Sequence, residues 1–429
     1  FYDRCLFHTT VEETRWDEDA ARWTVKTDRG DAMKAQFVVL ANGILTTPKL
    51  ARIDGMESFK GDAFHSSRWN YHVDLKDKKV GIIGTGATAV QIIPEIAKEV
   101  ADLYVFQRTP STIDVRDQRV TTEEEAQRWL NEPGWAVARR ERLATISAGR
   151  TALKANDDFL SGKIDHVKAP KVHATQLPPE ELIARQLNTN FRIMEQIRGR
   201  VDAVVDDPEV AELLKPYYSY GCKRPTFHDQ YLPSFNRPNV HLINTAPAGV
   251  SKINETGVVH NGIEYPVDAL IYATGFQWMG TSTFNMVTGP GGRTLNSKWK
   301  EEGTKTFLGM HSSGFPNLLI MTGPQGGGGQ FNFTRVCEMH ATYVTWMLTE
   351  MRDRGLETVD VKKEFEDEYA HHCREMDLLS QPLRDCYSYY NGDGSAEPGS
   401  LAYYGGGDRW HERRKAAQAS LDPYIFKMQ

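Results

Sequence analysis

The chain has 429 residues, of which 40% are hydrophobic and 25% charged, and its formal net charge is −6. This length exceeds what one hydrophobic core usually supports, so at least two domains are expected. The sequence shows no basic run typical of nucleic-acid binding and no apolar stretch of the ~18–20 residues that span a membrane, so neither partner is expected.

In chain order, strands come first and helices follow. Residues 5–28 alternate as two strands around a turn at 17–19, and 36–43 form a buried strand that ends at a glycine. Residues 44–79 are expected to be rich in loops. From 121 to 216 the pattern predicts a helical insertion, with a capping box at Thr122 and Glu125 and further helix starts near Pro178 and Asp207.

Strands return in the second half of the chain, at 240–243, 269–275 and 317–323. The last two run into glycines. A long amphipathic helix is predicted from 334 to 354, where Gly355 ends it. The last 45 residues are rich in Gly, Tyr and Asp and are expected to wrap the surface.

The most informative segment spans residues 79–106. Lys79–Ile83 predicts a buried parallel strand, and the next six residues have the G-x-G-x-x-A spacing of a dinucleotide-binding turn. These six residues are Gly84, Thr85, Gly86, Ala87, Thr88 and Ala89. The first glycine permits the sharp turn, the second lets a pyrophosphate approach, and the small residue at 89 lets the helix at 87–98 lie close to the strand. The helix N-terminus then faces the phosphates.

The residues that follow the second strand of this unit, at 103–106, indicate which dinucleotide is bound. An NAD site usually has an acidic residue there for the ribose 2′-hydroxyl, but this chain has Arg108, followed by Thr109. An arginine pairs with a 2′-phosphate, and such a charge-assisted contact is worth ~1.5–3 kcal/mol, roughly a 10- to 150-fold preference for NADPH. The competing interpretation is a glycine-containing turn with a solvated arginine.

The five cysteines form no C-x-x-C pair and no zinc pattern, so no metal site is expected. Their odd, scattered set indicates free thiols in a reducing compartment, and with no visible signal peptide the protein is expected to be cytoplasmic. The sequence His371-His372-Cys373 lies in a charged helical stretch and is expected to be a solvated face.

Four stretches together resemble the Baeyer–Villiger monooxygenases, which are class B flavoproteins. The first is Phe59–Asn70, which follows the family fingerprint F-x-G-x-x-x-H-x-x-x-W but has Asn70 where Pro or Asp is usual. The others are the turn with Arg108, the segment from Cys222 to Val240, and Ala273–Phe276. The resemblance covers nearly the whole chain.

The resemblance implies an α/β fold of two dinucleotide-binding, Rossmann-like domains with a helical insertion at about 117–216. The FAD domain is expected to be incomplete at its N-terminus, because the family's first G-x-G-x-x-G turn has no counterpart here. The implied domains are 1–75 for the remainder of the FAD domain, 76–239 for the NADP-binding domain, and 240–429 for the return of the FAD domain with a segment bordering the substrate.

The resemblance also implies the roles of single residues. Arg224 corresponds to the catalytic arginine that acts at the flavin peroxide, and Lys223 to a lysine that reaches the 2′-phosphate. The full set of cofactor-binding candidates is Gly84, Thr85, Gly86, Ala87, Thr88, Gln91, Arg108, Thr109, Lys223, Val11, Asn332 and Phe333. His65 and Trp69 correspond to positions that couple domain movement to cofactor binding.

The implied activity depends on NADPH and FAD and inserts one oxygen of O2 beside a ketone carbonyl, through a flavin peroxide, to give an ester or lactone. One alternative is an N- or S-oxidising flavin monooxygenase on the same scaffold. Another is a truncated NADP-binding pseudoenzyme without activity, which the missing FAD turn motivates.

Overall fold

The structure is a computed structural model that describes residues 1–43, 45–147, 178–277, 282–327, 333–380, 385–388 and 402–428. Contacts divide the chain into two compact units. Unit 1 comprises Phe1–Thr47, Gln277–Gln381 and Tyr389–Gln429, and unit 2 comprises Pro48–Phe276 and Pro382–Ser388. These boundaries differ from those predicted at 75/76 and 239/240, because strands from both sides of those positions pair in one sheet of unit 2. The assignment of a cofactor to each part stays a prediction.

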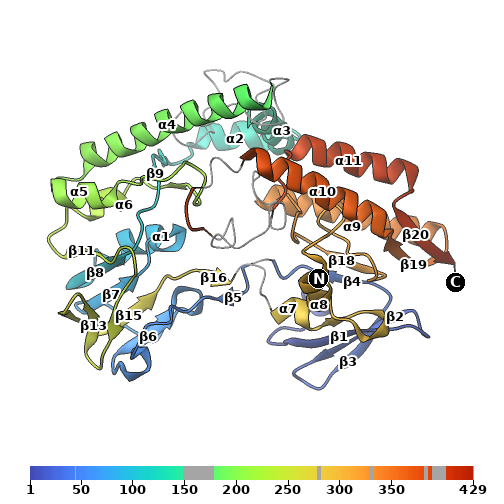
Figure 1. The fold of residues 1–429 in the computed structure, drawn as a ribbon, viewed down its shortest axis with the longest axis horizontal. Helices are drawn as coiled ribbons and strands as arrows, with labels where there is room; N and C mark the ends of the chain where they lie inside the picture. The colour runs from blue at the N-terminus through green and yellow to red at the C-terminus, as the bar shows by residue number, and fades with distance from the viewer. Residues whose placement is uncertain are drawn as a thin grey trace. The chain divides into compact units, whose positions relative to one another are not determined.

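Unit 2 is built on a five-stranded sheet in which every neighbouring pair is parallel, in the order β11, β8, β7, β15, β6 (Figure 1). The strands are β6 (Asp62–His65), β7 (Lys79–Ile83), β8 (Asp102–Gln107), β11 (Val240–Asn244) and β15 (Ala269–Tyr272). From β7 the chain adds β8 and β11 on one side, whereas β15 lies on the other. The strand order therefore switches between β7 and β15, and ligands of open α/β sheets bind at the carboxyl ends of strands at such a point.

The two faces of this sheet are covered differently. Helix α1 (Ala87–Ile96) packs Ile93 against Ile82 and Val105 on one face. On the other face Phe106 and Leu270 pack against the antiparallel sheet of β12 (Lys252–Ile253), β13 (Gly257–His260) and β14 (Ile263–Pro266). Because both faces are buried, the central strands are continuous apolar runs rather than alternating ones.

The remaining elements of unit 2 are short strands and helices. The helices are α2 (Glu123–Asn131), α3 (Trp135–Ser147), α4 (Pro179–Val204), α5 (Pro208–Leu214) and α6 (Tyr231–Ser234), with 3-10 turns η2 (Met56–Ser58) and η3 (Ser66–Arg68). Strand β9 (Ile113–Asp114) pairs with β10 (Thr226–Phe227), and β5 (Thr47–Pro48) pairs with β16 (Phe276–Gln277) where the chain passes from one unit to the next.

Unit 1 combines small sheets with a helical core. Its four-stranded sheet has the order β17 (Val287–Thr288), β1 (Val11–Asp17), β2 (Arg22–Thr27), β3 (Ala32–Ala35), and two further pairs join β18 (Leu318–Ile320) to β4 (Val38–Leu40) and β19 (Leu356–Val361) to β20 (Tyr424–Met428). Its helices are α7 (Ser282–Asn285), α8 (Leu295–Glu302), α9 (Phe333–Asp353), α10 (Lys363–Ser380) and α11 (Gly407–Ser420), with 3-10 turns η1 (Tyr2–Arg4) and η5 (Pro290–Gly292).

Most predicted elements are confirmed, with shifted ends. The strand at 79–83 matches β7, the capping box of Thr122 and Glu125 starts α2, and Asp207 caps α5. The strands expected at 36–43 and 269–275 are shorter, as β4 and β15. Of the predicted helical insertion, residues 148–177 lie outside the described part of the chain.

The passage at 44–79 is rich in loops, as predicted, and it also contains β6, an edge strand of the main sheet that is too short to show a periodic pattern. One element prediction is wrong. The C-terminal segment does more than wrap the surface, since α11 and β20 place Trp410 and Tyr424 in the core of unit 1. The solvated face expected at 371–373 is also wrong for Cys373, which is buried in that core.

Among the described residues, no helix is both long and apolar enough to cross a membrane.

Candidate functional site

The turn between β7 and α1 lies at the switch point of the sheet. Gly84 has φ of +109°, and a Cβ added there would lie 2.5 Å from the carbonyl oxygen of Ala273, at the end of β15. The Gly84 N–H donates to the Phe106 carbonyl at 3.1 Å. The chain thus needs glycine here for two reasons, a left-handed backbone and a close approach to the neighbouring strand.

Gly86 is the N-cap of α1 and faces open space. Its φ of −72° suits any residue, no side chain caps the helix, and an added Cβ would meet nothing within 4 Å. The first N–H groups of a helix have no partner within the helix, and they carry partial positive charge. Ala89, one turn on, is fully buried in the helix–sheet core. The backbone therefore offers an open, donor-rich place for a phosphate, with the helix held close to the strand.

The other turn residues have different surroundings. The Thr85 side chain is buried, and its hydroxyl donates to the Thr109 carbonyl at 2.8 Å, so it braces the turn against the segment that follows β8. Thr88 lies exposed in the first turn of α1. Gln91 donates from Nε2 to the Ala87 carbonyl at 2.9 Å, along its own helix. The structure thus brings the predicted turn residues together but turns the Thr85 hydroxyl inward.

Arg108 is exposed and directly follows β8. Within the described ranges it makes no hydrogen bond or ion pair with another residue. Its guanidinium is a permanent positive charge beside the turn, which is the position required for recognising a 2′-phosphate.

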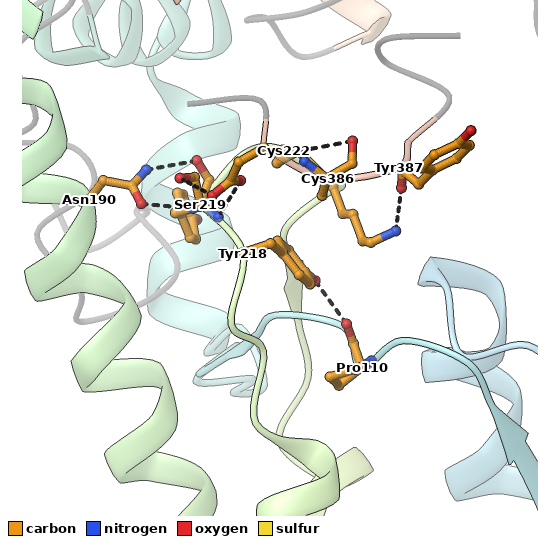
Figure 2. The surroundings of a disulfide bond; sticks show 10 residues. Pro110, Asn190, Tyr218, Ser219, Cys222, Cys386 and Tyr387 are labelled. Atoms are coloured by element: carbon orange, nitrogen blue, oxygen red, sulfur yellow. Dashed lines mark hydrogen bonds between the residues drawn. A yellow bond between two sulfur atoms is a disulfide. The ribbon is translucent and has the colours of Figure 1, made fainter. Parts of the chain in front are cut away.

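Lys223 is connected to the same segment through Tyr218, which Figure 2 shows beside Pro110. The Lys223 ammonium lies 5.6 Å from the centre of the Tyr218 ring, and the Tyr218 hydroxyl donates to the Pro110 carbonyl at 2.9 Å. Pro110 is two residues from Arg108 in the chain. A buried tyrosine thus holds the lysine segment against the Arg108–Pro110 segment.

The segment that carries Arg224 is anchored on both sides. Thr226 donates to the Thr112 carbonyl from its N–H at 3.1 Å and from its hydroxyl at 2.7 Å, and on the other side Cys222 forms a disulfide with Cys386. Arg224 itself is exposed, and it makes no ion pair with a side chain that the structure describes. The backbone therefore fixes the position of a cation whose side chain points away from the core.

The disulfide corrects the prediction that all cysteines are free thiols. Cys222 and Cys386 are bonded, whereas Cys5, Cys337 and Cys373 are free. The two bonded residues are 164 positions apart, a separation that gives no signal in the sequence. The cysteines therefore no longer argue for a reducing compartment.

The fingerprint residue His65 links β6 to the segment after β15. Its Nδ1 accepts from the Ser67 N–H at 3.2 Å, so Nε2 carries the proton and donates to the Gly275 carbonyl at 3.0 Å. Burial lowers the pKa of His65 and favours this neutral form. Trp69 packs edge-on against Phe64, with ring centres 5.1 Å apart. These residues shape the switch point rather than present a reactive group.

The remaining candidates belong to unit 1. Val11 is the first residue of β1, and Phe333 is the exposed first residue of α9. Asn332 lies outside the described residues. Thr322, which follows β18, donates from its N–H to His340 Nδ1 at 3.0 Å, and the His340 ring stacks on Trp410 at 5.3 Å.

Sequence reasoning missed the residues that hold the site together. Tyr218, Thr226 and Asp385 make the bracing contacts, and nothing in their spacing marks them. The one available signal was the position of Cys222 directly before Lys223.

Comparisons with known proteins agree on one family. A family model described as flavin-binding monooxygenase-like matches residues 4–120. The chain is 36% identical to a Baeyer–Villiger monooxygenase of Stachybotrys chlorohalonatus, over 98% of this chain and 71% of that protein. Among solved structures it resembles the polycyclic ketone monooxygenase of Thermothelomyces thermophila, with a TM-score of 0.88 and 30% identity over 100% of this chain and 74% of that one. It also resembles a steroid monooxygenase bound to NADP, with a TM-score of 0.82 and 29% identity over 98% and 80% of the two chains.

Proposed function

The chain belongs to the Baeyer–Villiger monooxygenases of the flavin-binding monooxygenase family, and we propose that it binds NADPH at the β7–α1 turn and uses Arg224 at the reacting carbonyl. The activity of this family depends on FAD and NADPH and converts a ketone into an ester or lactone with one oxygen of O2. The α/β fold matches the solved monooxygenases.

The open space at Gly86 is the observation that carries the NADPH assignment. A pyrophosphate needs backbone N–H donors and no side chain between them and itself, and Gly86 at the start of α1 meets both needs. Ala87 and Thr88 supply the next N–H groups of the same turn. The residues present therefore fit a dinucleotide.

Arg108 and Lys223 would hold the 2′-phosphate. The two residues come from segments joined through the hydrogen bond of Tyr218 to Pro110. A phosphate dianion gains charge-assisted hydrogen bonds from both cations, while NADH has only a hydroxyl at that position. Thr109 would act through its backbone, since its carbonyl accepts from Thr85.

FAD, when bound, supplies the activated oxygen for the reaction. Toward it we propose Val11, Phe333 and Asn332 as contacts from unit 1, with unit 1 as the FAD side and unit 2 as the NADPH side of the chain. Phe333 is 46% exposed at the start of α9, so its ring is available to a planar ligand.

Arg224 would stabilise the negative charge that develops on the ketone oxygen during attack. An arginine keeps its proton at any physiological pH and presents a planar set of donors, so its charge is permanent. The anchors at Cys222 and Thr226 hold its backbone before the substrate arrives, and preorganised donors stabilise a transition state better than mobile ones.

Product analysis tests the function. The purified chain is supplied with FAD, NADPH, oxygen-18-labelled O2 and a panel of cyclic and polycyclic ketones, and its visible spectrum reports flavin binding. An ester or lactone that carries one labelled oxygen is expected. Thioether and amine substrates are run beside the ketones, because sulfoxide or N-oxide formation without ester would favour the heteroatom-oxidising alternative. A colourless protein that binds NADPH without oxygenating any substrate would favour the inactive alternative.

The Arg224→Ala variant tests the assigned role. It should retain NADPH-dependent flavin reduction, and its rate of ester formation should fall by about 10²-fold or more. Removing one hydrogen-bond donor to a developing oxyanion has an effect of this size in other enzymes. Arg52→Ala is the matched control, since Arg52 is also an exposed arginine of unit 2. Ester formation at the wild-type rate in Arg224→Ala would overturn the assignment.

A further inference from the structure

We propose that the Cys222–Cys386 disulfide is a redox switch that sets how tightly Lys223 holds the 2′-phosphate of NADPH. The inference rests on the proposed role of Lys223 and adds a regulation to it. In the bonded form the disulfide fixes Lys223 in place, and its reduction releases the segment that fixes it.

The segment in question, residues 385–388, is called the strap here. It packs against the loop at 219–223 through contacts on consecutive residues (Figure 2). The Asp385 carboxylate accepts from the Ser219 N–H at 2.8 Å and from the Ser219 hydroxyl at 3.1 Å. The Cys386 N–H donates to the Cys222 sulfur at 3.0 Å, and the Lys223 ammonium donates to the Tyr387 carbonyl. The strap thus contacts the lysine itself.

From Lys223 these contacts continue to the dinucleotide turn. Lys223 lies over the Tyr218 ring, the Tyr218 hydroxyl donates to Pro110, and Thr85 of the turn donates to Thr109. The disulfide therefore sits at the end of an unbroken series of contacts within unit 2. An ammonium has three donors, so a phosphate can bind it while the Tyr387 carbonyl keeps one.

Reduction weakens this arrangement by removing its covalent link. The strap lies 164 residues along the chain from the loop it contacts, and closing so long a segment costs conformational entropy that the disulfide removes in advance. Once the bond is broken, the Lys223 side chain regains rotamers that phosphate binding must order again. Ordering one such side chain reduces affinity by roughly twofold to tenfold.

The chemistry requires a dithiol reductant of the thioredoxin or dithiothreitol class. Its thiolate attacks the Cys386 sulfur, the S–S bond breaks, and Cys222 leaves as a thiolate that takes up a proton. The second thiol of the reductant then displaces Cys386 and closes the reductant's own disulfide, so two electrons and two protons reach the protein. Cys386 is partly exposed and Tyr387 is 69% exposed, whereas Cys222 is buried, so attack occurs at Cys386.

The test measures dissociation constants of NADP+ and NAD+ by calorimetry on the FAD-supplied full chain, before and after dithiothreitol. Thiol titration of the unfolded protein verifies the state, since Cys5, Cys337 and Cys373 are the free cysteines of the bonded form. Reduction should weaken NADP+ binding roughly twofold to tenfold and leave NAD+ binding unchanged, because NAD+ lacks the 2′-phosphate. Cys386→Ser should show the weakened value with or without reductant.

Two further variants separate the switch from the proposed function. Cys337→Ser removes a free thiol of α9 and should keep the full response. Lys223→Ala should weaken NADP+ binding in both states and abolish the response. If Lys223→Ala leaves the ratio of the NADP+ and NAD+ dissociation constants unchanged, the proposed role of Lys223 is wrong. If that variant weakens NADP+ binding but complete reduction of the wild type does not, the switch is wrong. A bonded form that is absent from protein alkylated in the cell would also overturn it.

Discussion

Gly84 and Gly86 stand two residues apart, yet a methyl group would have opposite effects at the two positions. At Gly84 it would meet the Ala273 carbonyl on a backbone with positive φ, whereas at Gly86 it would point into open space from an ordinary backbone. The fold needs glycine at position 84, and we propose that the ligand needs it at position 86. The two substitutions therefore separate stability from binding.

Gly86→Ala should fold and lose NADPH affinity by tenfold or more, because its Cβ would occupy the place of the pyrophosphate. Alanine is a poorer N-cap than glycine, so a small loss of stability, about 0.5–1 kcal/mol, accompanies it. Gly84→Ala should lower the free energy of unfolding by about 1–3 kcal/mol from backbone strain alone. Thermal unfolding and NADP+ titration measure the two effects, and unchanged NADP+ affinity in Gly86→Ala would exclude phosphate binding at this turn.

The site could be predicted from the sequence where a residue's reason for being there is local. Gly84, Gly86 and Ala89 serve a turn of six residues, and the structure gives each the surroundings that the spacing predicts. Thr85 is different, since its hydroxyl is used by Thr109, which comes from the end of another strand. The Cys222–Cys386 bond joins residues that are even farther apart in the sequence. Contacts between segments far apart leave no periodic trace in the sequence.

At the scale of elements, the same distinction decides which strands could be predicted. Strand β7 and helix α1 carry their signals within their own residues, as an apolar run and as the glycine-containing turn that leads into the helix. Strand β6 has four residues at the sheet edge, and only its pairing with β15 makes it a strand. The order of the sheet likewise depends on pairings that a linear pattern does not contain. Fold class is thus predictable from local patterns, and sheet order is not.

A buried ion pair joins α8 to α10 in unit 1. The Lys298 ammonium lies 2.8 Å from the Glu366 carboxylate, with side chains 4% and 0% exposed. The Ser313 N–H also donates to Glu366 at 2.9 Å. Removing one member of such a pair leaves an uncompensated buried charge, which costs about 3–5 kcal/mol.

Lys298→Met should therefore lower the free energy of unfolding by about 3–5 kcal/mol, measured by urea denaturation. Adding Glu366→Gln should recover part of this loss, because the amide oxygen still accepts from Ser313 without a charge. Lys34→Met is the matched control, since the Lys34–Asp17 pair is exposed and should cost no more than about 1 kcal/mol. If Lys298→Met and Lys34→Met lowered the free energy of unfolding equally, burial would not be what makes the Lys298–Glu366 pair costly to break.

Across the whole molecule, the family motifs are distributed unevenly between the two units. All four motifs lie in unit 2, where contacts connect them: the fingerprint at 59–70, the turn, the segment from Cys222 to Val240, and Ala273–Phe276. Of the unit 1 candidates, the structure describes Val11 and Phe333, which lie on different elements, β1 and α9. The proposed NADPH side therefore has geometric support from contacts between its residues, whereas the proposed FAD side rests on the resemblance to the family.

Several buried groups have pKa values that differ between the folded and the unfolded chain, so the free energy of unfolding depends on pH. Burial lowers the pKa of His311 to about 3 and that of His340 to about 4, against about 6.5 for an unfolded histidine. As the pH falls below about 6.5 the unfolded chain binds protons that the folded chain does not, so each histidine lowers the free energy of unfolding by about 1.4 kcal/mol per pH unit. The loss from each histidine ends near its folded pKa. Burial also raises the pKa of the Asp360 carboxyl to about 6, and this group acts in the opposite direction between pH 6 and about 4.

Two variants isolate these contributions with opposite signs. His311→Gln keeps a hydrogen-bonding group for the Tyr343 hydroxyl, which lies 2.8 Å from His311 Nε2, but removes the titration. Its free energy of unfolding should therefore fall with acid by about 1.4 kcal/mol per pH unit less than that of the wild type. Asp360→Asn removes the opposing proton uptake, so its loss between pH 6 and 4 should be steeper by about the same amount. Urea denaturation at several pH values, followed by tryptophan fluorescence, measures the slopes. If the curves of unfolding free energy against pH were parallel for the wild type and His311→Gln, His311 would bind its proton as readily in the folded protein as in the unfolded chain.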